Sequence, residues 1–327
     1  MNNSYAPDDT AAQLYAEETW FQGALLGNIA YGAELTLFIM SFNVLYKKIN
    51  ESNRRTHISL LAFIMLIFVL GTLFMAFNAK FAQMAFIQYR NFPGGPGAYE
   101  EVDFSNPIDE VANVCFIIGN WLMDALLVWR CFVIYRNCRK ITLFAVLVLP
   151  CLLLLASVAT GTAELAETHT SSPFQYVNIT LAYFSMTIAL NVIVTILIVC
   201  RLLVYRWRVA RVMGPNHTSE YATMTAIIIE SAIMYSAFAI LFIVPFGIGN
   251  SLGNVFLQTV SQVQTASSLL IVYRLASGRG WTENTCAQIL TKRGASEIQL
   301  DRINSLDKKA LPDSTTDGTH MEVEPPV

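Results

Sequence analysis

Charged residues are scarce in this sequence, and long apolar runs take up most of the chain. Only 14% of the 327 residues are charged and 54% are hydrophobic, whereas soluble domains carry roughly 25% charged residues. The few charges are grouped between the apolar runs, so no soluble core of comparable size remains. The composition therefore favours one membrane domain with two tails.

Several kinds of chemistry lack the residues that they need. None of the four histidines lies within a long apolar run, and zinc hydrolases of the membrane need histidine ligands at depth. Residues 254–275 contain no lysine, which excludes a retinal Schiff base there. The six cysteines form no CxxC pair, and neither a phosphate loop nor a nucleic-acid module is visible. We therefore expect a non-enzymatic protein without metal, cofactor, retinal or nucleic acid.

Seven segments are long and apolar enough to cross a bilayer, which takes about 20 residues per helix. They span residues 20–46, 58–80, 111–135, 141–163, 176–205, 223–247 and 254–275. The predicted fold class is an all-α membrane protein with a seven-transmembrane-helix bundle. We divide the chain into a polar extracellular N-terminus (1–19), the transmembrane domain (20–275), a cytoplasmic juxtamembrane segment (276–310) and a disordered cytoplasmic tail (311–327).

The charges of the connecting loops predict an orientation with the N-terminus outside and the C-terminus inside. Basic residues concentrate in cytoplasmic loops of membrane proteins. The loops expected inside carry Lys47, Lys48, Arg54, Arg55, Arg136, Arg139, Lys140, Arg206, Arg208, Arg211, Arg274 and Arg279. The loops expected outside carry Glu100, Glu101, Asp103, Asp109, Glu110, Glu164 and Glu167. We expect a multi-pass protein of the plasma membrane rather than of an internal membrane.

The parts outside the spans suggest several local features. The run Pro93–Gly97 predicts turns, and the mixed segment after the seventh span predicts a short surface helix. Asn2 is the one sequon that this topology makes a sensible glycan acceptor. Cys138 and Cys286 lie beside the membrane and are candidate palmitoylation sites, the alternative being ordinary free thiols.

Polar residues inside the spans are the candidate functional residues, because a charge in the bilayer core is costly. Asn113, Asn120 and Asp124 are spaced by seven and four residues, which places them on one helical stripe facing the bundle interior. The expected ligand or ion pocket comprises Glu34, Asn113, Asn120, Asp124, Asn191, Gln258 and Gln262. The alternative is that these side chains only hydrogen-bond helix to helix, each contributing roughly 0.6 kcal/mol.

Arg130 and Glu230 lie at matching depth in the third and sixth spans. Arg130 is roughly 8 Å and Glu230 roughly 10 Å from the cytoplasmic ends of these helices, at 1.5 Å per residue. Opposite charges at equal depth in hydrocarbon are expected to pair. The prediction is an ion pair that joins the two helices. The alternatives are that Arg130 reaches the lipid headgroups or finds another acidic or backbone partner.

Four stretches together resemble a family of uncharacterised seven-helix membrane proteins of mushroom-forming fungi. They are NWLMDALLVWRCFVIYR, NVIVTILIVCRLLVYR, IIIESAIMYS and SLLIVYRLASGRGW, between residues 120 and 281. This resemblance implies a receptor-like protein without an established activity. The helix number and orientation are also similar to those of G-protein-coupled receptors, but Trp129-Arg130-Cys131 stands where their Asp-Arg-Tyr would be, and 254–275 contains no proline.

We therefore expect a G-protein-coupled-receptor-like protein that binds a small-molecule or peptide ligand from outside and contacts a cytoplasmic signalling partner. The alternative is a transporter or channel for a small solute or a proton, using Asp124, Glu34 and Glu230. The two functions differ in whether a polar path crosses the membrane or the cytoplasmic half is closed beneath an outward pocket. An enzyme is the third and least supported function.

Overall fold

The computed structural model describes residues 10–49, 54–102, 106–136, 138–168, 177–213, 219–274 and 276–277, and these contain helices but no strand. The elements are α1 (Ala11–Lys47), α2 (Arg54–Gln83), the π-helix η1 (Met84–Gln88), α3 (Gly95–Val102), α4 (Pro107–Tyr135), α5 (Lys140–Thr168), α6 (Val177–Met213), α7 (Ser219–Gly247) and α8 (Leu252–Arg274). All of these except α3 belong to seven spans that are long and apolar enough to cross a membrane, with η1 continuing α2. The prediction of a seven-helix all-α membrane protein is confirmed.

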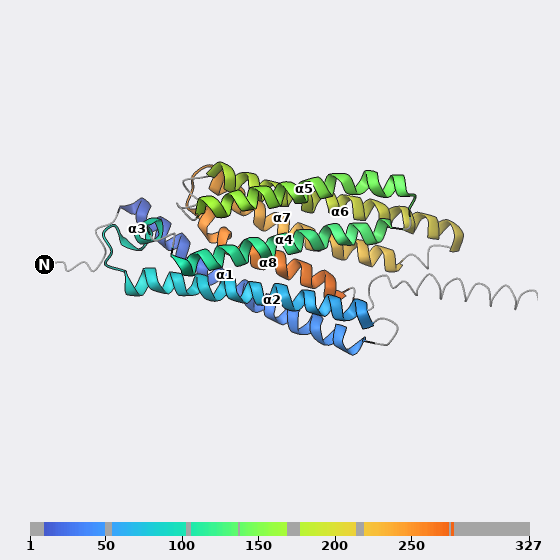
Figure 1. Ribbon diagram of the computed structural model, residues 1–327, viewed down its shortest axis with the longest axis horizontal. Coiled ribbons are helices and arrows are strands. Elements are labelled where there is room, and N and C mark those ends of the chain that lie inside the picture. The colour runs from blue at the N-terminus through green and yellow to red at the C-terminus, as the bar shows by residue number, and fades with distance from the viewer. Residues whose placement is uncertain are drawn as a thin grey trace, which may run out of the picture. The chain divides into compact units, whose positions relative to one another are not determined.

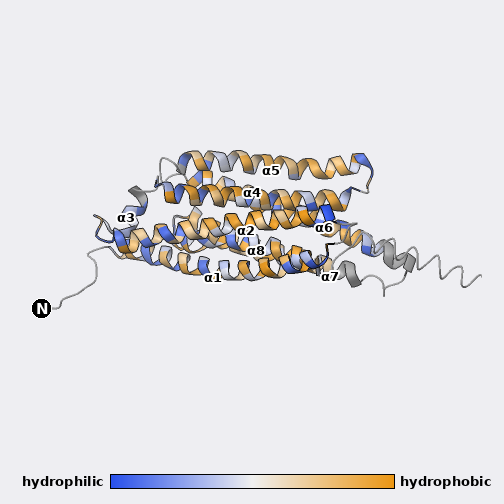
Figure 2. Cartoon of the chain, turned by 60° about the horizontal axis from the view of Figure 1, so that its bottom comes forward, coloured by the Kyte–Doolittle hydropathy of each residue, from blue (hydrophilic) through white to orange (hydrophobic). Residues whose placement is uncertain are grey.

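The seven long helices run alternately between two ends of one bundle (Figure 1). We call the end that holds α3, the start of α1 and the turn 248–251 the α3 end. The opposite end is the basic end, where Lys47, Arg54, Arg136, Lys140 and Arg274 lie at or beside the helix ends. Figure 2 shows hydrophobic residues along most of each long helix and hydrophilic residues gathered toward the helix ends. This distribution suits a bundle whose sides face lipid.

Helix α8 is the central helix of the bundle. It contacts α1, α2, α4 and α7, and 13 of its 23 residues are buried, compared with 7 of 37 in α1. The sequence predicts this enclosure, because α8 carries polar side chains on two faces. Two glycines let α1 approach closely: a Cβ atom added at Gly23 would lie 2.7 Å from the carbonyl oxygen of Asn254, and one at Gly27 would lie 3.4 Å from that of Gln258.

Helices α1 and α4 begin before the spans predicted for them, because polar residues cap their first turns. Helix α1 begins at Ala11 rather than near residue 20. The Thr10 hydroxyl accepts a hydrogen bond from the Gln13 amide at 3.3 Å, while the Gln13 side chain accepts one from the Thr10 amide at 3.0 Å, which is a capping box. Helix α4 begins at Pro107 after the N-cap Asn106, so both helices extend beyond their apolar stretches at the α3 end.

The run Pro93–Gly97 departs in part from the turns that its composition predicts. Gly94 and Gly95 have positive φ angles of 90° and 79° and form the expected turn. Helix α3, however, begins within the run at Gly95. Pro96 is compatible with the first turn because a helix leaves the amides of that turn unbonded. The expectation that the whole run is non-helical is therefore wrong for its second half.

Several sequence predictions lie outside the described residues. These are the glycan acceptor Asn2, the candidate acylation site Cys286, the tail 311–327, and all but two residues of the juxtamembrane segment in which a surface helix is predicted. Cys138 is described, and its thiol is free and half-buried. Its acylation stays a prediction.

Candidate functional site

Two residues of the predicted stripe on α4, Asn120 and Asp124, do face the bundle interior. Asp124 is fully buried, and its carboxyl group accepts a hydrogen bond from the Gln264 side-chain amide at 3.1 Å and one from the Ser157 hydroxyl at 3.4 Å. Asn120 is also buried and accepts a bond from the Ser261 hydroxyl at 3.3 Å. We call these five residues the polar layer. It ties α4 to α5 and α8 through neutral donors.

Glu34 and Gln262 lie in a separate contact between α1, α2 and α8. The Glu34 side chain is fully buried and occupies the space that Gly71 leaves, since a Cβ atom there would lie 2.5 Å from Glu34 Oε1. Neither carboxyl oxygen has a hydrogen-bond partner among the described residues. Gln262 donates a bond of 3.4 Å to the Gly71 carbonyl. The two side chains therefore pack near each other but do not join the polar layer.

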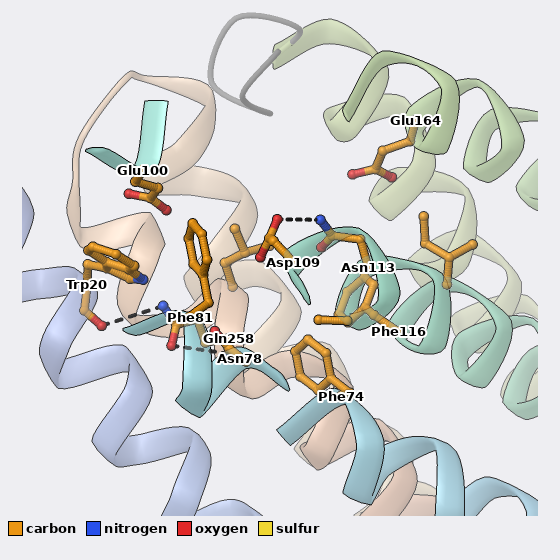
Figure 3. Close-up of a pocket in the computed structure, with 13 residues that line it drawn as sticks. Trp20, Phe74, Asn78, Phe81, Glu100, Asp109, Asn113, Phe116, Glu164 and Gln258 are labelled. Atoms are coloured by element: carbon orange, nitrogen blue, oxygen red, sulfur yellow. Dashed lines mark hydrogen bonds between the residues drawn. The ribbon is translucent and has the colours of Figure 1, made fainter. Parts of the chain in front are cut away.

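A cavity of about 90 Å³ lies between α1, α2, α4, α5 and α8 toward the α3 end. We call it the aromatic cavity, because Trp20, Phe74, Phe81 and Phe116 form much of its wall (Figure 3). Its volume corresponds to about three water molecules at 30 Å³ each. Drug-sized ligands occupy cavities of about 300–1,000 Å³, so this space suits only a small group.

Two of the predicted pocket residues do line the aromatic cavity. Asn113 lies on its wall and donates a hydrogen bond of 2.8 Å to the Asp109 carboxylate. Gln258 donates to the Trp20 carbonyl at 3.5 Å and accepts from Asn78 at the same distance (Figure 3). The other members of the predicted pocket, which are Glu34, Asn120, Asp124, Asn191 and Gln262, do not line it. The structure therefore divides the predicted residues among different places in the bundle.

Three carboxyl groups that the sequence analysis assigned only to outer loops line this cavity. They are Glu100, Asp109 and Glu164, which come from α3, α4 and α5 and surround the cavity in Figure 3. Sequence reasoning missed them because it searched for polar residues at mid-membrane depth. One signal was present: Asp109 precedes Asn113 by four residues and so shares its face of the helix.

A second and larger cavity of about 420 Å³ lies beside the first, under α3 and the turn 249–251. We call it the loop cavity. Trp20 and Glu100 line both cavities. On its wall the Glu17 carboxylate accepts a hydrogen bond of 3.1 Å from the Gly97 amide and so attaches α3 to α1. The two cavities together form the candidate functional site.

A third hollow, of about 520 Å³, lies between α2 and α4 toward the basic end. Its lining includes Arg55, Phe63 and Trp129, and 48% of the Trp129 surface is exposed. It is therefore a groove on the side of the bundle rather than an interior site. An apolar groove on a lipid-facing side needs no ligand other than lipid.

The predicted ion pair between Arg130 and Glu230 is wrong. Glu230 pairs instead with Arg274 at 2.9 Å, near the basic end. Arg130 donates to the Ser268 carbonyl at 3.3 Å, which is the backbone partner that the sequence left as an alternative. Arg130 therefore bonds α8 rather than α7.

Other contacts also close the half of the bundle between the polar layer and the basic end. The Ser267 hydroxyl donates to the Ser231 carbonyl at 2.6 Å, and the Tyr135 hydroxyl donates to the Leu197 carbonyl at 2.8 Å. Leu45, Ile64, Ile67, Met123, Leu269 and Val272 form a buried apolar cluster in this half. The Ser267 and Tyr135 hydroxyls therefore bond across helices and join α8 to α7 and α4 to α6.

The comparisons with known proteins add no identity to this geometry. Protein-family models, curated proteins and solved structures were compared with the chain, and none matches it. The geometry of the two cavities and of the closed half therefore carries the functional argument, with the chain established as a multi-pass integral membrane protein by its seven spans.

Proposed function

We propose that this protein is a non-enzymatic, receptor-like membrane protein that binds a ligand in the aromatic and loop cavities, with the α3 end facing outside. The observation that carries the proposal is the contrast between the two halves of the bundle. Both cavities lie toward the α3 end, whereas helix-to-helix hydrogen bonds and an apolar cluster fill the half toward the basic end. A receptor needs a ligand site that opens to the outside and a cytoplasmic half that stays closed.

The charges at the two ends support this orientation. Basic side chains gather at the basic end, as expected for the cytoplasmic side, and acidic side chains gather around the cavities. The plasma membrane is the membrane in which such a site would meet external ligands. Membership in the seven-helix family of mushroom-forming fungi is part of this proposal and rests on the four stretches quoted above.

Helix α8 supplies a physical connection between the site and the basic end. It carries Asn254 on the loop cavity, Gln258 on the aromatic cavity and Gln264 in the polar layer. Farther along, the Ser268 carbonyl accepts from Arg130, and Arg274 pairs with Glu230. A ligand that moves the first turns of α8 would therefore strain the hydrogen bonds and the ion pair that this helix makes nearer the basic end. We propose that cytoplasmic signalling partners sense this movement at the basic end.

A transporter or channel is the competing function, and it needs a path through the polar layer. Asn120 and Asp124 follow Asn113 on α4 by seven and eleven residues, which places them about 10 and 16 Å nearer the basic end along the helix axis. Both are buried and engaged with neighbours. Opening a path would break these bonds, whereas receptor function leaves them intact.

Thiol labelling tests the proposal without requiring a known ligand. In a cysteine-free background, Asn113→Cys places a thiol on the aromatic cavity and Ser267→Cys places one in the closed half. A membrane-impermeant maleimide is added to intact cells and, separately, to inside-out vesicles. We expect Asn113→Cys to react only from outside and Ser267→Cys to react from neither side.

Two results would overturn the proposal in different ways. Reaction of Asn113→Cys from both sides would indicate alternating access and favour a transporter. Reaction only in inside-out vesicles would reverse the orientation. The matched position Ala12→Cys, which is exposed in the first turn of α1 at the α3 end, reports whether the reagent and the protein are competent.

A further inference from the structure

The candidate site is rich in carboxyl groups and poor in positive ones. Glu17, Glu100, Asp109 and Glu164 line the aromatic and loop cavities, and the described residues that line them include no Lys, Arg or His. Asp109 accepts a hydrogen bond from the Asn113 side chain, and Glu17 accepts one from the Gly97 amide, so both bond to neutral donors. The described lining of the two cavities therefore carries negative charge and no positive charge.

Glu164 provides an independent sign that a ligand belongs there. The residue is only 7% exposed, and it lines the aromatic cavity with its carboxyl group directed toward Asp109 and Asn113 (Figure 3). One of its oxygens, Oε2, is buried without a hydrogen-bond partner in the part of the chain that the structure describes. An unpaired buried carboxyl oxygen costs free energy, and a donor or a positive charge in the cavity would recover it.

The walls of the cavity select the kind of cation. Trp20, Phe74, Phe81 and Phe116 surround the space, and aromatic faces attract organic ammonium groups through their quadrupoles. An inorganic metal ion fits less well, because the described residues contain no group of three His, Cys, Asp or Glu side chains able to hold one. Spread carboxyl groups and aromatic rings together suit a cation that carries its charge on an alkylated nitrogen.

The volumes of the two cavities limit the size of the ligand. The aromatic cavity of about 90 Å³ holds a compact head group. The adjoining loop cavity of about 420 Å³ shares Trp20 and Glu100 with it and offers room for the rest of a larger molecule. A ligand would therefore lie with its charged end in the deeper, more apolar space.

We infer that this site binds a small organic cation whose ammonium group lies in the aromatic cavity between Glu164, Asp109 and the aromatic rings. The inference rests on the proposed function, which it extends by naming the chemical class of the ligand. Glu164 supplies the unpaired acceptor, Asp109 supplies a second negative charge, and Trp20 forms a wall that both cavities share.

The test measures thermal unfolding of the purified full-length protein in an uncharged detergent. The probes are choline, tetramethylammonium and n-butylamine, each compared with sodium chloride at equal ionic strength. Choline is also compared with 3,3-dimethylbutan-1-ol, in which a carbon replaces the charged nitrogen. A ligand that binds only the folded state raises the unfolding temperature in a concentration-dependent way. We expect at least one cation to raise it and the neutral alcohol to leave it unchanged.

Variants locate the effect in the cavity. Glu164→Gln keeps the shape of the side chain and removes its charge, so we expect the apparent affinity for the cation to fall about tenfold or more. Asp109→Asn provides the same test if Glu164→Gln does not fold. Glu110→Gln is the matched control, because Glu110 adjoins Asp109 in sequence but does not line either cavity, and we expect it to keep the affinity of the unaltered protein.

The outcomes separate this inference from the proposed function. No shift with any of the three cations, an equal shift with the neutral alcohol, or an unchanged affinity in Glu164→Gln and Asp109→Asn would each overturn the cation site. Labelling of Asn113→Cys from outside only would still support the receptor-like proposal in those cases. Cation binding together with labelling from both sides would instead keep the ligand class and reject the receptor.

Discussion

The polar layer and the aromatic cavity both place carboxyl groups between apolar helices, but the two regions differ in the hydrogen-bond partners that they give to those groups. In the polar layer, Asp124 accepts hydrogen bonds from Gln264 and Ser157 and is fully buried. In the aromatic cavity, the Glu164 oxygen Oε2 has no hydrogen-bond partner among the described residues and lies beside the cavity. The difference teaches that an acidic residue within a membrane span becomes a candidate binding group when its neighbours leave room and an unpaired acceptor.

Glycine at position 161 marks the boundary between these two regions on α5. It lies four residues after Ser157 and three before Glu164. A Cβ atom at this position would lie 2.9 Å from Trp121 Nε1 and 3.0 Å from Tyr183 Cε2. The tight packing around Gly161 separates the aromatic cavity from the hydrogen bonds of the polar layer. Polar groups only two helical turns apart therefore have different surroundings.

The largest effect that we expect follows loss of the central acceptor of the polar layer. Asp124→Ala leaves the Gln264 and Ser157 donors unpaired and opens a void, so the free energy of unfolding should fall by about 2–3 kcal/mol. Reversible unfolding in mixed detergent and lipid micelles measures this change. Asp124→Asn keeps the shape and one acceptor oxygen and should cost about 1 kcal/mol or less. An Asp124→Ala protein as stable as the unaltered one would make Asp124 a functional rather than a structural residue.

A somewhat smaller effect is expected where α1 meets α8 beside the cavities. Gly23→Ala brings a Cβ atom to 2.7 Å from the Asn254 carbonyl and 3.0 Å from Val255 Cα, and backbone atoms cannot move aside as a side chain can. Overpacking of this kind costs about 1–3 kcal/mol. Because Trp20 and Asn254 line the loop cavity, the variant should also weaken ligand binding while leaving the polar layer intact.

The matched control for this substitution lies on the same helix. Gly32→Ala adds the same methyl group where nothing lies within 4 Å, and alanine has a higher helix propensity than glycine by about 1 kcal/mol. Thermal unfolding of the two variants should therefore shift in opposite directions. Equal shifts would mean that the close approach of α1 and α8 does not limit the size of residue 23.

The ion pair at the basic end should contribute less than either of these contacts. The Arg274 and Glu230 side chains are 30% and 60% exposed, and exposed pairs contribute about 0.2–1 kcal/mol. A double-mutant cycle with Arg274→Gln and Glu230→Gln should give a coupling energy in this range. The parallel cycle with Arg130→Gln and Glu230→Gln should be additive. Coupling only in the second cycle would restore the pair expected from the sequence.

The smallest effect is expected in the aromatic cavity, at the residue that contrasts most directly with Asp124. Glu164→Gln should change the free energy of unfolding by less than about 0.5 kcal/mol. Glutamine keeps the shape of the side chain, and the carboxyl oxygen Oε2 has no hydrogen bond to lose among the described residues. Unfolding in the absence of added cation provides the measurement. A loss as large as that of Asp124→Ala would show that Glu164 is a structural residue, and the contrast between the regions would disappear.

The sequence predicted the fold class well, because the requirement that determines it is local. A span needs about 20 apolar residues whatever surrounds it, and the seven predicted segments match the seven spans. The burial of Asn120 and Asp124 also followed from helical spacing alone, since lipid is a poor neighbour for both. The helix ends were less accurate, because caps such as Thr10 extend a helix beyond its apolar stretch.

The sequence did not predict which residues of different helices contact each other. Arg130 and Glu230 have suitable depths, but depth says nothing of the rotation of one helix relative to another, and the structure gives each a different partner. The same limit applies to the predicted pocket, whose members share a depth but are divided among several contacts. Glu100, Asp109 and Glu164 belong to one cavity although they come from three helices.

For this protein, then, apolar length and loop charge by themselves determined seven helices, their alternation and an expected orientation. Only the tertiary structure decided which of the described polar groups are hydrogen-bonded and which lie unpaired beside a cavity. The physical reason is that hydrophobic burial in lipid depends on each segment alone, whereas a hydrogen bond or a cavity depends on the rotation and spacing of at least two. Gly23 and Gly71 illustrate this: each is an ordinary glycine in the sequence, and each admits a particular neighbour in the bundle.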